Sequence, residues 1–205
     1  MFVIVEGPNG SGKTSLIKSL AQKGIKTLSS PNGTMLAKML RPACRGIAPW
    51  DTLDPMVRFF LFSAARLDEY TQLVHGHQEL IVADRWWTST YVYQCVLEGQ
   101  SVEAMKCTIH PEEKIDVVIR LDADDDVLIE RVKTERANNP SHGICKWTED
   151  EKTMREIIRI YRQDLPLFLK KRGVSCACID TTHISKDRVV EDFFEIGLLT
   201  QKPSL

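Results

Sequence analysis

Phe2-Val3-Ile4-Val5 and, one residue later, Gly7-Pro8-Asn9-Gly10-Ser11-Gly12-Lys13-Thr14 form the stretch that decides the fold. The first segment reads as a buried strand, and the second matches the pattern G-x-x-x-x-G-K-[ST] and opens a helix. Glycines let backbone N–H groups turn inward around an anion, and a helix N-terminus adds partial positive charge. The stretch therefore predicts a phosphate-binding loop; the alternative is a glycine-rich turn with an incidental lysine.

Two side chains of this loop have distinct expected roles. Lys13 is expected to bridge the β- and γ-phosphates of a nucleotide, and the Thr14 hydroxyl is expected to bind Mg²⁺. ATP and Mg²⁺ are thus the predicted cofactors. The residues expected to contact the nucleotide are Gly7, Asn9, Gly10, Ser11, Gly12, Lys13, Thr14 and Ser15.

Composition is that of an ordinary globular protein. Hydrophobic residues make up 43% of the 205 residues, and 27 basic residues nearly balance 28 acidic ones. This balance does not favour a nucleic-acid partner, although a nearly neutral total charge is compatible with a local basic cleft. No apolar run approaches the ~18–20 residues that span a bilayer, and the six cysteines are scattered, which favours reduced thiols. A single cytoplasmic domain over residues 1–205, with no membrane contact, is expected.

Short apolar runs alternate with amphipathic stretches along the chain, the pattern of a parallel sheet covered by helices. The pattern predicts an α/β fold of three layers, with a central parallel five-stranded sheet and helices on both faces. Residues 42–50 are predicted to form a loop, and the polar stretch 136–147 a lid. The five expected strands are Phe2–Val5, Ile25–Leu28, Leu80–Ala83, Val117–Leu121 and Val174–Ile179.

The third strand ends in Asp84-Arg85-Trp86, and Ser89 to Gln94 follow. The chain has neither the N-K-x-D motif of GTPases nor a strand ending in Asp-Glu, as in motor ATPases. Ligands of parallel sheets bind at the carboxyl ends of the strands. Asp84 and Arg85 are therefore candidate site residues, with a structural salt bridge as the alternative.

With these motifs in order, the chain resembles the thymidylate kinase family. The resemblance spans nearly the whole chain and rests on an N-terminal phosphate loop and four later motifs. These are Ser30-Pro31-Asn32-Gly33-Thr34, Leu61-Phe62-Ser63-Ala64-Ala65-Arg66, Asp84-Arg85-Trp86 with Ser89 to Gln94, and the strand exits Leu121-Asp122-Ala123-Asp124 and Ile179-Asp180-Thr181.

The resemblance implies an acceptor site on the third strand and the 54–75 helix. Phe62 would stack on the acceptor base and Arg66 would hydrogen-bond its edge; alternatively Arg66 is a solvated surface arginine. Arg85 would grip the acceptor phosphate, because a planar guanidinium fits phosphate oxygens. Asp84 would lie near Mg²⁺. Tyr93 would lie against the sugar and exclude a 2′-hydroxyl, unless it only packs in the core.

Further residues complete the implied site. Ser89 and Gln94 belong to the acceptor motif, and Gln94 would read the base or brace the loop. Some family members carry a catalytic arginine in the phosphate loop and others in the lid. Since Gly10 and Ser11 offer no arginine, Arg131 or Arg136 would cover the transferring phosphoryl group. The alternative for each is a solvated basic face.

The chain departs from the family pattern at two places. Asn9 replaces an acidic residue that the family holds near the acceptor 3′-hydroxyl. The arginine expected before Ser30-Pro31 is absent, unless Lys38 or Arg41 replaces it.

The leading functional prediction is ATP-dependent phosphorylation of a deoxynucleoside monophosphate, dTMP or a related pyrimidine, to the diphosphate. Two alternatives stay open: a kinase acting on a nucleoside or on a hydroxymethylated pyrimidine (free or in DNA), and a non-catalytic nucleotide-binding regulator. A small-molecule nucleotide is the expected partner. The resemblance also implies a homodimer, for which the 54–75 helix offers an interface.

Overall fold

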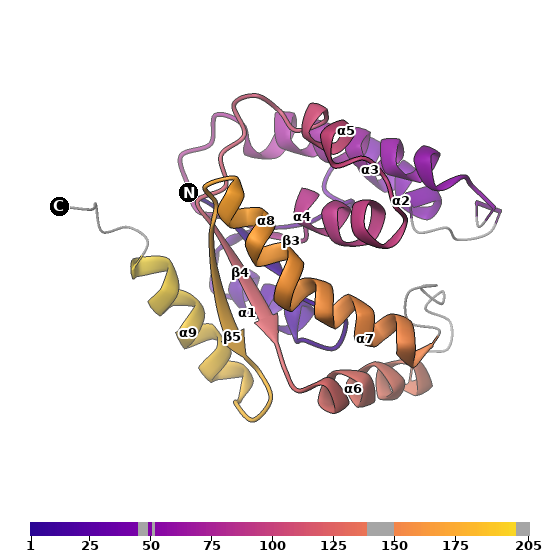
Figure 1. The fold of residues 1–205 in the computed structure, drawn as a ribbon. Helices are drawn as coiled ribbons and strands as arrows, with labels where there is room; N and C mark the ends of the chain where they lie inside the picture. The colour runs from indigo at the N-terminus through magenta and orange to yellow at the C-terminus, as the bar shows by residue number, and fades with distance from the viewer. Residues whose placement is uncertain (45–48, 51, 139–149, 200–205) are drawn as a thin grey trace.

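A computed structural model describes residues 1–44, 49–50, 52–138 and 150–199 (Figure 1). Its centre is one sheet of five parallel strands in the order β2-β3-β1-β4-β5. The predicted five-stranded parallel sheet is confirmed, and each strand lies within two residues of its expected position. The strands are β1 (Phe2–Glu6), β2 (Lys26–Ser29), β3 (Ile81–Asp84), β4 (Val117–Asp122) and β5 (Ser175–Asp180).

The register of the strands brings their carboxyl ends to one edge of the sheet. Val5 lies opposite Asp84 on β3, and Asp84 lies opposite Ser29 on β2. On the other side of β1, Asp122 pairs with Asp180. The chain that leaves β1 therefore enters the phosphate loop beside the exits of β3 and β4.

Helices cover both faces of the sheet (Figure 1), which confirms the three-layer prediction. One face packs against α1 (Lys13–Gln22) and α9 (Lys186–Leu199) through side chains such as Val5, Leu20 and Phe193. The other face packs against a larger set of helical elements. These are α3 (Pro55–Glu69), η1 (Tyr70–Val74), α4 (Trp87–Thr90), η2 (Tyr91–Leu97), α5 (Val102–Cys107), η4 (Ile160–Asp164) and α8 (Leu165–Lys171).

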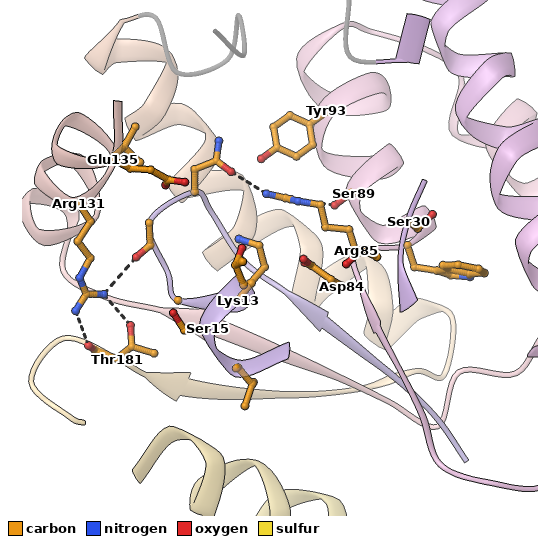
Figure 2. A pocket seen from close by; sticks show the side chains of 18 of the residues that line it. Lys13, Ser15, Ser30, Asp84, Arg85, Ser89, Tyr93, Arg131, Glu135 and Thr181 are labelled. Carbon is orange, nitrogen blue, oxygen red and sulfur yellow. Dashed lines mark hydrogen bonds between the residues drawn. The ribbon is translucent and has the colours of Figure 1, made fainter. Parts of the chain in front are cut away.

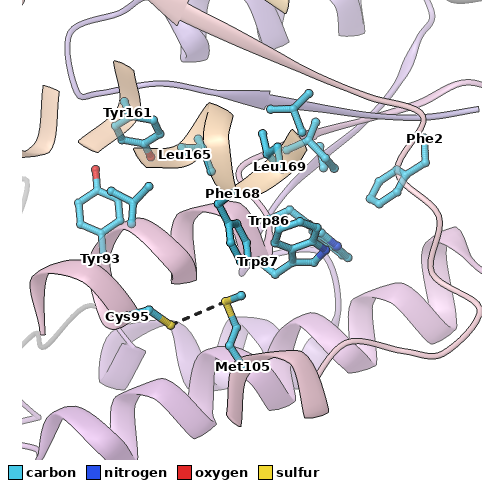
Figure 3. Packing of buried hydrophobic residues seen from close by; sticks show 14 of the residues in the cluster. Phe2, Trp86, Trp87, Tyr93, Cys95, Met105, Tyr161, Leu165, Phe168 and Leu169 are labelled. Atoms are coloured by element: carbon cyan, nitrogen blue, oxygen red, sulfur yellow. Dashed lines mark hydrogen bonds between the residues drawn. The ribbon is translucent and has the colours of Figure 1, made fainter. Parts of the chain in front are cut away.

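The core follows from the alternation of side chains along β1. Val3 and Val5 face α1 and α9, while Phe2 and Ile4 face the opposite cluster, and all four are buried. Figure 3 shows the second cluster, where the Trp87 ring meets Phe168 edge to face at 6.1 Å. Truncating such a fully buried side chain to alanine costs about 2–5 kcal/mol, so this core holds the loop-bearing strand firmly.

α2 (Met35–Cys44) and α6 (Asp125–Asn138) lie at the carboxyl edge of the sheet. α2 packs against α3, and α6 packs against α7 (Glu151–Arg159). The helix that the sequence suggested from residue 148 to 171 is observed as α7, η4 and α8 in succession. Of the predicted lid, residues 139–147 lie outside the described part of the chain, and residues 136–138 end α6.

The loop predicted for residues 42–50 is wrong at its start. Pro42 lies inside α2, which continues to Cys44. A proline removes one helix hydrogen bond, but Ala43 and Cys44 are buried against the rest of the molecule. Tertiary packing therefore carries the helix two residues past the proline. Residues 45–48 lie outside the described part.

The described cysteines are all free. Within the described ranges, the longest apolar helix falls short of what crossing a membrane requires.

Candidate functional site

A cleft of about 1080 Å³ opens at the carboxyl edge of the sheet. It runs from the phosphate loop and the start of α9, past β3, to the inner side of α2, α3 and η2. Fifteen of the residues that the sequence predicted for the site line this cleft. The predicted residues that line it are Asn9, Gly10, Gly12, Lys13, Thr14, Ser15, Phe62, Arg66, Asp84, Arg85, Ser89, Tyr93, Gln94, Arg131 and Arg136.

The phosphate loop is held against its neighbours where glycine is required. Gly7 has φ 143°, and a Cβ there would lie 2.2 Å from the Leu121 carbonyl oxygen on β4. Gly10 has φ 82°, and its Cβ would lie 2.7 Å from the carbonyl oxygen of Leu128. No larger residue fits either contact, so the loop sits close on β4 and α6. Gly7 and Ser11 shape the loop from inside and do not line the cleft.

Lys13 is folded back onto the loop. Its Nζ donates to the carbonyl oxygens of Gly7 and Pro8, both at 2.7 Å, and lies 3.3 Å from Ser11 Oγ. Burial, and then the positive charge of Arg85, lower the pKa of Lys13 to about 7. The protein alone therefore compensates the positive charge of this amine poorly, and an anion in the cleft would stabilise the charged form.

Arg85 occupies the elbow after β3. Its φ of 69° is unusual for a residue with a side chain, and its N–H donates to Val5 O at 3.1 Å. The guanidinium donates from Nη2 to Asn9 Oδ1 at 2.8 Å, and from Nη1 to Ser89 Oγ at 3.1 Å and Tyr161 Oη at 2.9 Å. These bonds fix the Arg85 side chain beside the phosphate loop. Figure 2 shows Arg131 and Thr181 on one side of Lys13, and Asp84, Arg85 and Ser89 on the other.

The residues expected at a magnesium ion fit such an ion. Asp84 Oδ1 is buried and accepts no hydrogen bond from the described residues. Thr14 is exposed and shares the cleft wall with Asp84. A buried carboxylate oxygen without a donor is costly, and Mg²⁺ or one of its water ligands would satisfy it.

The far end of the cleft holds the predicted base-recognition residues. Arg66 on α3 is 3% exposed and donates from Nη2 to Thr108 O at 3.1 Å and to Thr108 Oγ1 at 2.9 Å. Its Nε is buried without a partner among the described residues. Arg66 is therefore no surface arginine, and burial lowers its pKa to about 10. Phe62, one turn earlier on the helix, and Gln94 also line this end.

Tyr93 lies between the two ends of the cleft. Its ring is buried and faces the Arg85 guanidinium carbon, which lies 5.5 Å from the ring centre. It packs in the core and lines the cleft at once, because the segment that carries it, η2, is helical and turns the ring toward both.

The two arginines of α6 differ in their surroundings. Arg131 uses both terminal nitrogens: Nη1 donates to Gly10 O (3.3 Å) and Thr181 Oγ1 (3.0 Å), and Nη2 to the carbonyl oxygens of Thr181 (2.8 Å) and Thr182 (3.5 Å). It thus ties α6 to the phosphate loop and to the end of β5. Arg136 lines the cleft near the end of α6.

Several residues of the site were not anticipated from the sequence. Glu6 and Tyr161 lie behind Arg85. Glu69 holds the turn after β2 by accepting from Ser30 Oγ and from two backbone N–H groups of that turn. One signal was available: a charged residue, Glu6, closes an otherwise apolar strand.

Arg41, one of the two residues raised as a replacement for the missing arginine, lines the cleft. It lies on α2 and donates to Pro31 O at 2.7 Å. Lys38 is exposed and lies outside the cleft wall.

Comparisons with known proteins agree with this geometry. A family model described as thymidylate kinase matches residues 5–169. The thymidylate kinase of Mycoplasma pneumoniae is 25% identical over 194 residues, which cover 88% of this chain and 90% of that protein. The thymidylate kinase of Chlamydia caviae is 32% identical over 124 residues, about half of each chain at 54% and 57%.

A solved structure shares the fold. The crystal structure of thymidylate kinase from Ehrlichia chaffeensis matches with a TM-score of 0.68 at 18% identity, over 97% of this chain and 98% of that one. The family match spans most of the chain. It includes the phosphate loop and the arginines that line the cleft at the carboxyl ends of the strands. The chain belongs to the thymidylate kinase family and is a phosphotransferase.

Proposed function

We propose that this enzyme transfers the γ-phosphoryl group of ATP to dTMP and forms dTDP and ADP. One observation carries the proposal: a single cleft joins the phosphate loop to the buried Arg66, with Arg85 between them. A donor on the loop and an acceptor against Arg66 can therefore meet at Arg85. The named relatives are thymidylate kinases, which makes dTMP the first acceptor to test.

The donor half of the site is the phosphate loop. Its backbone N–H groups and the start of α1 favour the triphosphate, and Lys13 is free to exchange its carbonyl partners for phosphate oxygens. Thr14 and Asp84 would hold Mg²⁺, which when bound neutralises charge on the phosphates.

The acceptor half is built from three arginines, Arg85, Arg41 and Arg66, and the ring of Phe62. Arg85 keeps N–H groups that no described residue uses, and we assign them to the acceptor phosphate. Arg41 reaches the same cleft from α2 and takes the place of the arginine missing before Ser30. The unpartnered Nε–H of Arg66 suits a carbonyl oxygen of a base that lies on Phe62.

The reaction needs little from the protein beyond position and charge. An oxygen of the acceptor phosphate attacks the γ-phosphorus, and the bond from that phosphorus to the β-bridging oxygen breaks, leaving ADP. The acceptor phosphate is already anionic, so no strong base is required. Lys13 and Arg85 both line the cleft in which the reacting phosphates would meet.

Arg136 is the better candidate to cover the transferring group. The terminal nitrogens of Arg131 are taken up by Gly10 and the residues after β5. Arg131 would have to break several hydrogen bonds to reach a phosphoryl group. We therefore assign Arg131 to holding the loop and Arg136 to the phosphoryl group.

The test is a coupled assay that measures ADP release with each common deoxynucleoside monophosphate, with thymidine and hydroxymethylated pyrimidine nucleosides, and with DNA containing the modified base. We expect dTMP to be preferred. Transfer only to nucleosides or DNA would favour the alternative kinase, and ATP binding without transfer to any acceptor would favour a regulator. Lys13→Ala should abolish transfer, which separates this enzyme from a contaminant.

We also propose that the enzyme acts as a homodimer. α2 and α3 pack against each other and carry exposed apolar side chains, including Met39 at 72% and Phe60 at 53% exposure. In α3 the apolar positions follow helical spacing, and Val57, Phe60 and Leu67 face outward. A second copy of the same surface would cover it.

A further inference from the structure

Glu6, the last residue of β1, carries a carboxylate that is completely shielded from solvent. Four groups donate to it. They are the Trp86 backbone N–H (3.3 Å), Thr88 Oγ1 (2.5 Å), Ser89 Oγ (2.9 and 3.0 Å to the two oxygens) and Tyr161 Oη (2.9 Å). A buried carboxylate is tolerated only when hydrogen bonds and an opposite charge compensate it. The charge here is Arg85, whose Nη1 lies 3.8 Å from Glu6 Oε2.

Two of these hydroxyls connect the carboxylate to the arginine. Ser89 Oγ and Tyr161 Oη each accept a hydrogen bond from Arg85 Nη1 and lie within hydrogen-bond distance of Glu6. Figure 2 shows Ser89 beside Arg85, and Figure 3 shows Tyr161 next to Tyr93, whose ring centre lies 6.3 Å from its own.

The charge of Glu6 sets the direction of both hydroxyls. An ionised carboxylate only accepts hydrogen bonds, and a hydroxyl has one hydrogen to give. Each hydroxyl that gives its hydrogen to Glu6 must present a lone pair to Arg85. Glutamine at this position would bring an NH₂ group to the same donors, and a hydroxyl that accepts from it turns its hydrogen toward the guanidinium.

Glu6 also supports the backbone of the elbow. The N–H of Trp86, the residue after Arg85, donates to the carboxylate, and Arg85 itself has a positive φ. A non-glycine residue with such a φ is strained and persists only where its surroundings hold it. The carboxylate thus restrains Arg85 at both its main chain and its side chain.

We propose that Glu6 is a positioning residue for acceptor binding, which sets Arg85 for the acceptor phosphate through the hydroxyls of Ser89 and Tyr161. The proposal rests on the proposed function, in which Arg85 grips that phosphate. Glu6 is buried and does not line the cleft. Its effect on the reaction is carried by the orientation of one guanidinium.

The test is a double-mutant cycle on kcat/KM for dTMP with saturating ATP and Mg²⁺. We expect Glu6→Gln to lower kcat/KM for dTMP by about tenfold or more, while the KM for ATP changes by less than about threefold. In the Arg85→Ala background the same change should add less than about threefold, because the group it positions is gone.

Matched variants separate position from stability. Thr88→Val removes a buried hydrogen bond to Glu6 without touching Arg85, so it should lower Tm and leave kcat/KM for dTMP within about threefold. Tyr161→Phe removes one link to Arg85 and should lower kcat/KM by severalfold. If Glu6→Gln does not fold, Tyr161→Phe takes its place in the double-mutant cycle with Arg85→Ala.

The outcomes are distinct. If Arg85→Ala alone leaves dTMP kinetics unchanged, the proposed role of Arg85 fails. If Arg85→Ala is damaging but Glu6→Gln and Tyr161→Phe lower activity by the same factor with and without Arg85, the positioning role is overturned and the proposed function stands. Equal activity losses for Thr88→Val and Glu6→Gln would also overturn it.

Discussion

At the scale of single residues, Lys13 shows how the site is prepared for an anion. Its amine is buried against carbonyl oxygens, and burial and then Arg85 lower its pKa to about 7. Phosphates beside the amine would favour the charged form and return the pKa toward its ordinary value. Nucleotide binding should therefore be coupled to protonation of this one side chain.

We expect ATP binding to take up roughly one proton per site at pH 8, since most of Lys13 is neutral there before binding. Calorimetry in two buffers of different ionisation enthalpy measures the uptake. At pH 6 the amine is already charged, so the uptake should largely disappear. Binding enthalpies at pH 8 that do not depend on the buffer would contradict the assignment.

At the scale of elements, the phosphate loop is shaped by its contact with β4. A Cβ on Gly7 would lie 2.2 Å from the Leu121 carbonyl oxygen, at a φ of 143°. Gly24, after α1, also has a positive φ of 82°, but no atom lies within 4 Å of its would-be Cβ. Substituting Gly24 therefore tests the cost of a positive φ alone, whereas substituting Gly7 also tests the close contact with Leu121.

Gly7→Ala should lower the free energy of unfolding by several kcal/mol and weaken ATP binding, because the loop must move off β4. Gly24→Ala should cost only about 1 kcal/mol, the strain of its φ alone. Chemical denaturation and nucleotide titration measure both. Equal losses in the two variants would mean that the contact with Leu121 is unimportant.

The two arginines of α6 offer a second test at this scale. Arg136→Ala should lower kcat by about 10²- to 10³-fold, as removal of a transition-state charge contact does, with little change in Tm. Arg131→Ala should instead lower Tm and raise the KM for ATP, because it unties α6 from Gly10 and Thr181. The reverse pattern, read from steady-state kinetics and thermal denaturation, would exchange the two assignments.

The elements differ in how well the sequence predicts them. The five strands are predictable because each is an apolar run between turn residues. The end of α2 is not predictable, because Pro42 indicates that the helix stops there. Only the burial of Ala43 and Cys44 extends it. Tyr91, Val92 and Tyr93 form a short alternating apolar run in the sequence, and in the structure they lie in the helical η2.

At the scale of the whole molecule, the exposed apolar faces of α2 and α3 stand apart. Met35 and Met39 on α2 and Phe60 on α3 are each more than half exposed. Large exposed apolar patches in soluble proteins mark interaction surfaces. Helical spacing in the sequence could not say whether this stripe faces the core or another molecule.

We expect the protein to have twice its chain mass of 23.3 kDa in solution. Phe60→Lys should shift it to the monomer, as measured by light scattering or sedimentation. Leu167→Lys is the matched control, since Leu167 on α8 is 60% exposed and lies on another element. A wild-type monomer, or an equal shift in both variants, would contradict the dimer.

The sequence by itself determined the phosphate loop and the succession of strands and helices along the chain. It also identified the side chains Phe62, Arg66, Asp84 and Arg85, which line the cleft. Local patterns carry these because strand, loop and helix follow one another within a few residues. Only the tertiary structure decided what surrounds them. Glu6 and Tyr161 are 155 residues apart and meet at Arg85, because the sheet register and the packing of η4 bring them together, and no local pattern encodes that distance.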